Sequence, residues 1–187
     1  MFRQKNKNIV YLAKLLWFAP IILLFWLVRQ NSVPSGILEA SYSFQKNATD
    51  FEEESPYIFH LEPKGRLRTR SFEDGYWMQS WYAEPIYFYL KMPRLFNKAN
   101  LEIIYRNQHN IPFRLAYEKG QTSYDWEFIK VNTSTELENG WQKDTFSLDL
   151  NSIKITNNKL RFMLSATTMK NSDQVIDLRK VKIILTD

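Results

Sequence analysis

Aromatic side chains that alternate with polar ones are the residues of this chain best suited to chemistry. In the segment 75–82, alternation places Trp77, Gln79 and Trp81 on one side of a strand, two indoles with an amide between them. An indole offers a flat apolar face on which the C–H face of a sugar ring can stack, while nearby amides and carboxylates bind the hydroxyl groups. This pattern favours a sugar-binding surface.

A second aromatic row follows in the segment 84–92. The aliphatic row of Ile86, Phe88 and Leu90 is expected to face a core, which leaves Tyr87 and Tyr89 on the opposite face. An open alternative is that the rings fill the core or support one another as cross-strand pairs. With one further indole, the candidate ligand-binding residues are Trp77, Gln79, Trp81, Tyr87, Tyr89 and Trp126.

Three arginines, Arg66, Arg68 and Arg70, also alternate, so a strand would place them about 7 Å apart on one face. Guanidinium groups bind carboxylate and phosphate, and the row is a candidate site for an anionic polymer such as a phosphate- or uronate-bearing glycan. The alternatives are pairing with acids on a neighbouring strand, or protection of a sheet edge.

The sequence argues against catalysis. Its only histidines are His60 and His109, it has no cysteine, and it contains no nucleophile, zinc-protease or phosphate-loop motif. We therefore expect no enzyme, no metal site and no cofactor. Two possibilities stay open: a structural calcium ion helped by Asp173 and Asp177, and a glycosidase-like carboxylate pair. The carboxylates available for such a pair are Glu73, Asp74, Glu84, Asp125, Glu127, Asp149 and Asp177.

The chain begins with a basic segment followed by an apolar one. Three basic residues among the first eight precede an apolar run over residues 9–28 that only Lys14 interrupts, and no acidic residue occurs before Glu39. About 20 helical residues match the hydrocarbon thickness of a bilayer. The sequence therefore predicts an uncleaved single-pass anchor in the cell membrane. By the positive-inside rule the N-terminus is cytoplasmic and the rest of the chain extracytoplasmic.

Two other interpretations of this segment remain open. The uninterrupted apolar part has about the length of a signal-peptide core, but no Ala-x-Ala pattern follows it. The other interpretation is a buried helix of a soluble domain.

The charge balance excludes a nucleic-acid partner: five of the 25 basic residues lie before residue 31, which leaves 20 basic against 20 acidic residues in the remainder.

Short segments of period-two alternation, separated by turn signals such as Asp74-Gly75 and Asn139-Gly140, continue to the end of the chain. They predict an all-β fold, an antiparallel two-sheet β-sandwich of jelly-roll type, preceded by one N-terminal transmembrane helix. Tyr42 and Phe44 alternate with serines and could add a first short strand. The expected organisation is a basic tail over 1–8, the transmembrane helix over 9–28, a stalk over 29–55 and the sandwich over 56–187.

The stretch "IYFYLKMPRLFNKANLEIIYRN", with "WQKDTFSLDL" and "LRFMLSA" after it, resembles the galactose-binding-like jelly roll of carbohydrate-binding modules. Similar domains occur in membrane-tethered bacterial proteins. The resemblance implies a non-catalytic module and brings no invariant ligand motif. We expect a membrane-anchored extracytoplasmic binding module with a glycan ligand; the alternative is a structural or assembly protein of the cell envelope whose sandwich docks another protein.

Overall fold

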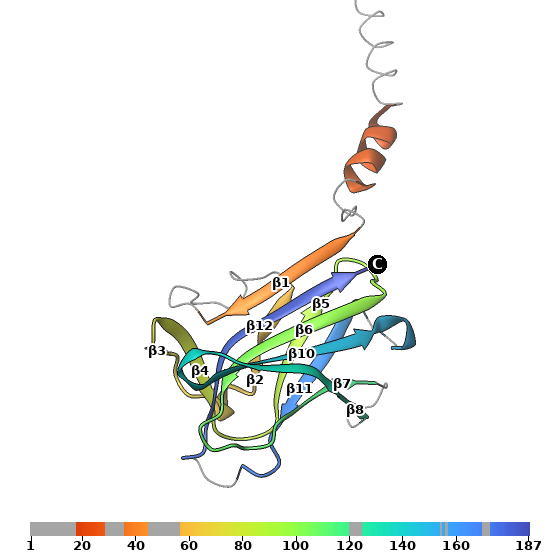
Figure 1. Ribbon diagram of the computed structural model, residues 1–187. Coiled ribbons are helices and arrows are strands. Elements are labelled where there is room, and N and C mark those ends of the chain that lie inside the picture. Colours follow the sequence, from red (N-terminus) through yellow and green to blue (C-terminus); the bar gives the residue numbers. More distant parts are fainter. Residues whose placement is uncertain are drawn as a thin grey trace, which may run out of the picture. The chain divides into compact units, whose positions relative to one another are not determined.

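The computed structural model describes residues 18–28, 36–44, 57–119, 125–153, 155, 157–169 and 173–187. The chain divides into two compact units, Met1–Ser35 and Gly36–Asp187. In the first unit, residues 18–28 are helical (Figure 1). Within the described residues, no helix combines the length and the apolar character needed to cross a membrane. The predicted basic tail, residues 9–17 of the predicted span and much of the predicted stalk lie outside the described residues.

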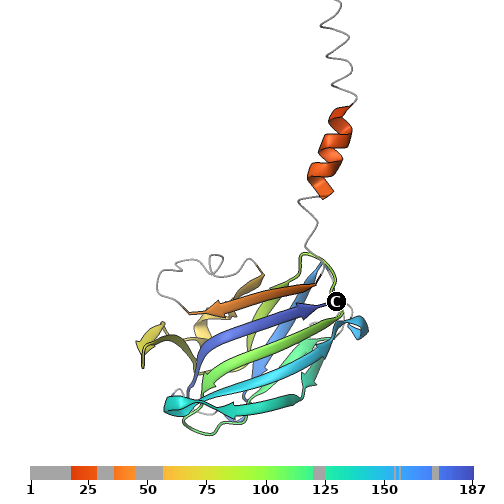
Figure 2. The ribbon, with the colours of Figure 1, turned by 45° about the horizontal axis from the view of Figure 1, so that its top comes forward.

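The second unit is a β-sandwich, as the alternation predicted. Its two antiparallel sheets lie one over the other (Figures 1 and 2) and share one apolar core. The larger sheet has seven strands in the order β3-β4-β12-β6-β10-β9, with β1 also paired to β12. These strands are β1 (Ile37–Ser43), β3 (Ser71–Glu73), β4 (Tyr76–Trp81), β6 (Lys98–Arg106), β9 (Val131–Glu136), β10 (Trp141–Asp149) and β12 (Ile176–Thr186).

The smaller sheet has five strands in the order β2-β5-β11-β7-β8. Three short 3-10 helices connect strands of the sandwich: η1 (Lys64–Arg66), η2 (Glu138–Gly140) and η3 (Leu150–Ser152). The strands of the smaller sheet are β2 (Ile58–Glu62), β5 (Ile86–Lys91), β7 (Arg114–Glu118), β8 (Trp126–Ile129) and β11 (Lys159–Ser165).

The core follows the alternation of the central strands. On β5, Ile86, Phe88 and Leu90 are fully buried, and Phe88 stacks on Phe162 of β11 with 4.9 Å between the ring centroids. Burying an aromatic or aliphatic side chain of this size contributes roughly 1.5–3 kcal/mol. The inward row predicted for β5 is confirmed, and the intervening Tyr87 faces away from the core.

The sandwich begins earlier than the predicted boundary at residue 56. Strand β1 pairs with β12 from Ile37 opposite Thr186 to Ser43 opposite Lys180, and Tyr42 is buried in the core. Alternation of Tyr42 and Phe44 with small polar residues suits a strand that has one face covered and one face wet. Part of the segment expected to be a stalk therefore belongs to the larger sheet.

The predicted strand over the segment "RLRTRSF" is wrong for most of its length. Residues Lys64–Arg66 form η1, Leu67 makes an isolated bridge with Trp81, and β3 begins only at Ser71. The Lys64-Gly65 turn signal lies directly before the segment, and the backbone N–H of Arg66 returns to the carbonyl of Pro63. Because Arg66 lies in η1 and strand pairing after it is limited to the single bridge at Leu67, the three arginines do not form one row on one strand.

Candidate functional site

Three aromatic side chains and one arginine meet on the outer face of the five-stranded sheet. Tyr87 and Tyr89 project from β5, Arg161 from β11, where it stands opposite Tyr89, and Trp126 from β8. The Cζ atom of Arg161 lies 4.2 Å from the ring centroid of Tyr87, 5.4 Å from that of Tyr89 and 5.5 Å from that of Trp126. We call these four residues the Tyr–Arg–Trp cluster.

The platform formed by the Tyr–Arg–Trp cluster is a stack in which two rings lie over each other and Arg161 lies near all three rings. Tyr87 and Trp126 stack with 5.5 Å between their centroids and 29° between their planes, although they come from strands separated by β11 and β7. A guanidinium held over aromatic faces is attracted to their π electrons by about 0.5–2 kcal/mol. The side chains of Tyr87, Tyr89, Trp126 and Arg161 are all half-buried, so the platform is held in place and still reaches solvent.

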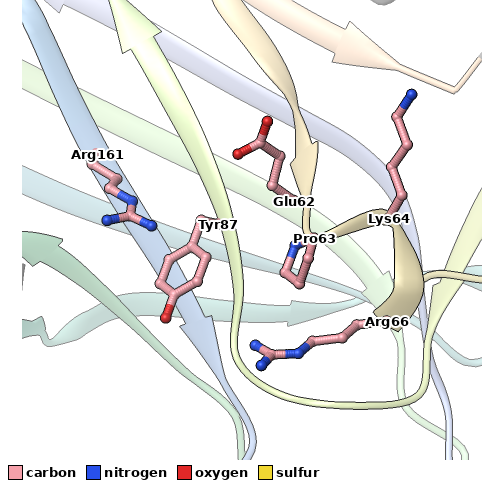
Figure 3. A pocket seen from close by; sticks show the side chains of 6 residues that line it. All are labelled: Glu62, Pro63, Lys64, Arg66, Tyr87 and Arg161. Carbon is pink, nitrogen blue, oxygen red and sulfur yellow. The ribbon is translucent and has the colours of Figure 1, made fainter.

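A pocket of about 460 Å³ adjoins the platform (Figure 3). Its lining is formed by Glu62, Pro63 and Lys64 at the end of β2, by Arg66, and by Tyr87 and Arg161 from the Tyr–Arg–Trp cluster. Arg66 and Arg161 both extend toward the Tyr87 side of the pocket, whereas Lys64 points away from it (Figure 3). Arg66 is held by a hydrogen bond that its Nη1 donates to the carbonyl of Pro85. Aromatic, cationic and carboxylate groups thus converge at one opening.

The predicted platform on β4 is wrong. The side chain of Trp81 is 0 % exposed and packs edge-on against Phe113, with 6.1 Å between the ring centroids. Gln79 is buried and donates a hydrogen bond to the carbonyl of Arg68, and Trp77 is half-buried against Phe72. The row of Trp77, Gln79 and Trp81 faces the interior because β4 joins the larger sheet beside β12, which leaves no indole face at Trp81 for a ligand.

The three arginines predicted to form one row, Arg66, Arg68 and Arg70, lie in separate places. Arg66 lines the pocket beside Tyr87. Arg70 donates a hydrogen bond of 2.8 Å to the hydroxyl of Tyr42 and lies over the Phe44 ring, which ties it to the larger sheet, and Arg68 is exposed between them. The site therefore combines Tyr87, Tyr89 and Trp126 of the predicted aromatic set with one arginine of the predicted row.

The sequence reasoning missed Arg161 and Glu62. The signal for Arg161 was present, because in "KLRFMLSA" the inward row of Leu160, Phe162 and Leu164 leaves Arg161 on the outer face, as it leaves Tyr87 on β5. That β11 lies beside β5 was not visible in the sequence. Glu62 enters the pocket because the pairing of β2 with β5 shifts its register between Phe59 and Glu62, which places Glu62 opposite Tyr87.

Three of the carboxylates considered for catalysis converge, but on an arginine. The guanidinium of Arg106 bonds Glu73 at 2.7 Å, Asp74 at 3.2 Å and Asp177 at 3.1 Å. Burial disfavours the charge of Arg106, but the hydrogen bonds and charges of Glu73 and Asp177 outweigh burial and raise the pKa of Arg106. This cluster fastens the β3–β4 hairpin to β6 and β12 and presents no open pair of acids.

Asp177 also lacks a free oxygen for the suggested calcium ion. Its second carboxylate oxygen accepts a hydrogen bond of 2.6 Å from the hydroxyl of Ser80. Across the part of the chain that the structure describes, no group of three His, Asp or Glu side chains is arranged to hold a metal ion.

No family model matches this sequence, and no curated protein does either. Among solved structures, the CBM22-1 xylan-binding domain of Xyn10C from Paenibacillus barcinonensis is similar, with a TM-score of 0.53, 14% identity and coverage of 83% of this chain and 99% of that domain. The K2 cleaved adhesin domain of Lys-gingipain gives a TM-score of 0.43 at 10% identity, covering 80% of this chain and 100% of that one. The mannan-recognising module TmCBM27 gives 0.42 at 14% identity, covering 81% and 99%. The chain thus shares the β-sandwich fold of the xylan-binding domain.

Proposed function

We propose that this protein is a non-catalytic glycan-binding module, tethered to the cell membrane by its N-terminal segment, and that the glycan lies on the Tyr–Arg–Trp cluster. The observation that carries the proposal is the stack of Tyr87, Arg161 and Trp126 on the outer face of the five-stranded sheet. Half-exposed aromatic side chains next to charged hydrogen-bonding groups are what a sugar, apolar on its faces and polar at its rim, requires.

The adjoining pocket supports the same proposal. Its volume of about 460 Å³ lies within the range of small-molecule sites, roughly 300–1,000 Å³. The carboxylate of Glu62 accepts hydrogen bonds from sugar hydroxyls, and the guanidinium of Arg66 donates them. The rings of the cluster then hold the faces of the sugar units that extend from the pocket across the sheet.

The membrane tether rests on the apolar run over residues 9–28 and the basic residues before it. The large side chains of residues 21–28 are exposed on their helix, as Phe25 is at 76 %, which suits contact with lipid. Extraction of native membranes at alkaline pH tests this part: an anchored protein stays in the pellet, and recovery in the supernatant overturns the tether. The extracytoplasmic location of the sandwich predicts cleavage by a protease added outside intact cells.

The glycan assignment is tested by binding of the full chain, held in detergent, to an array of cell-wall and plant polysaccharides. Trp126→Ala and Tyr87→Ala are expected to abolish binding, because each removes a stacking face. Phe72→Ala is the matched control, since it removes an exposed ring from the β3–β4 hairpin, at 59 % exposure. No binding by the folded protein to any polysaccharide, or equal loss in all three variants, would overturn the assignment.

A second candidate function is the docking of an envelope protein. The observation that favours it is the β3–β4 hairpin, where Phe72 is 59 % and Tyr76 41 % exposed. Exposed apolar rings on a hairpin are typical of protein contacts. Photo-crosslinking from position 72 in native membranes tests it: a discrete adduct that Tyr76→Ser abolishes supports docking, and absence of an adduct removes this candidate.

A further inference from the structure

The outer face of the five-stranded sheet carries positive charge next to the aromatic platform. In the pairing of β5 with β11, Lys91 stands directly opposite Lys159, one step along the same face from the pair of Tyr89 and Arg161. Both lysines are exposed. Like charges directly opposite each other on neighbouring strands destabilise a sheet. A basic pair at this place therefore has a cost in the free protein.

Positive side chains also outnumber negative ones in the lining of the pocket. Lys64, Arg66 and Arg161 line it together with one carboxylate, Glu62. Among the described residues, none of these three cations, nor Lys91 or Lys159, forms an ion pair. The Nε of Arg161 is buried without a hydrogen-bond partner in the same part of the chain.

On the larger sheet, by contrast, two lysines have acidic partners on neighbouring strands. Lys182 pairs with Glu39 at 2.7 Å across β1 and β12, and Lys143 lies 3.9 Å from Glu102 across β10 and β6. The chain beyond residue 30 holds as many acidic as basic residues. Beside the platform, the cations have no acidic partner among the described residues.

We infer that the glycan bound by this face is acidic, with carboxylates on its sugar units; this inference rests on the proposed function. A planar guanidinium matches a carboxylate with two parallel hydrogen bonds, and Arg161 and Arg66 both line the pocket on the side of Tyr87. Lys91 and Lys159 extend the positive surface to a neighbouring sugar unit. Their mutual repulsion is relieved when the ligand supplies the opposite charge.

The test compares three uronate polymers, glucuronoxylan, polygalacturonate and alginate, each with a counterpart whose carboxylates have been reduced to alcohols. The full chain in detergent is titrated with each by calorimetry. We expect at least one acidic polymer to bind about 10-fold or more tightly than its reduced counterpart. Raising the salt from about 0.05 M to about 0.5 M should weaken that binding.

The variant Lys91→Gln/Lys159→Gln is expected to weaken binding of the acidic polymer and to leave binding of the reduced one unchanged. The variant Lys98→Gln/Lys143→Gln removes the same charge from the larger sheet and should leave both unchanged. Equal binding of acidic and reduced polymers overturns the acidic ligand and leaves the glycan-binding function standing. If no polymer binds in either form, the inference of an acidic ligand is overturned. If the polysaccharides of the array do not bind either, the glycan-binding function is overturned as well.

Discussion

Arg161 lies over the ring of Tyr87, with its Cζ atom 4.2 Å from the ring centroid. The two residues come from paired strands, β11 and β5, that are about 70 residues apart along the chain. Trp126 of β8 lies beside the same guanidinium. This contact gathers side chains of three strands into one platform, and it is the structural basis of the proposed site.

Arg161→Ala is expected to weaken glycan binding about 10-fold, because the rings lose the cation beside them and the ligand loses a charged donor. Isothermal titration with a glycan that the array identifies measures the change. Arg94→Ala, which removes an arginine paired with Asp187 elsewhere, is the control and should bind as the wild type does. Equal affinities for the two variants would show that Arg161 has no part in binding.

Trp81→Ala is expected to lower the free energy of unfolding by about 3–5 kcal/mol, because it leaves a cavity in the core. Trp77→Ala should lower the free energy of unfolding by less, since Trp77 is only half-buried. Urea unfolding followed by circular dichroism measures both. A Trp81→Ala protein that keeps its stability would contradict the burial of this indole.

A fragment of residues 36–187 is expected to fold, and one of residues 56–187 to be unstable or to aggregate. The shorter fragment lacks β1, so β12 is left with an open edge and the core loses Ala40 and Tyr42. Thermal unfolding and size-exclusion chromatography of the two fragments make the comparison. Equal melting temperatures would mean that β1 contributes little to the sandwich.

Asp177→Ala is expected to lower the free energy of unfolding by at most about 3–5 kcal/mol, because it removes the buried partner of Arg106. Glu73 and Asp74 still contact the guanidinium and limit the loss. In a double-mutant cycle with Arg106→Met, the double variant should lose less than the two single variants together. Additive losses would show that Asp177 and Arg106 act independently.

Alkaline pH is expected to destabilise the sandwich through Tyr117. Burial, together with the hydrogen bond to Glu127 and its charge, raises the pKa of Tyr117 to about 12. An unfolded tyrosine ionises near pH ~10, so this group's contribution to stability is complete below about pH 10 and is lost as the pH rises toward 12.

The tyrosine prediction is measured by urea unfolding at pH values from about 9 to about 11.5, with Tyr117→Phe as the comparison. The Tyr117→Phe protein should lose stability less steeply above pH ~10 than the wild type does. Burial and Asp144 also raise the pKa of Tyr105, so Tyr105 accounts for part of the stability that the Tyr117→Phe protein still loses at high pH. Identical slopes for the two proteins would contradict the raised pKa of Tyr117.

The period-two pattern was sufficient to predict the sandwich and most of the strands that build it, but it missed β9 and wrongly predicted one strand through Arg66, Arg68 and Arg70. It also predicted which face of β5 points inward, because Phe88 stands in a row of apolar side chains. On β4 the pattern was ambiguous. Both of its faces carry large or polar residues, and pairing with β12 turned Trp81 inward.

The sequence by itself determined the two-sheet class, the neutral charge of the domain and the outward direction of Tyr87, because these depend on composition and on the local geometry of an extended backbone. Only the tertiary structure decided that Arg161 and Trp126 lie beside Tyr87, that Arg66 lies apart from Arg68 and Arg70, and that the side chain of Trp81 is buried in the core. Those outcomes depend on which strands pair and in what register, and pairing joins residues far apart in the chain that no local pattern connects.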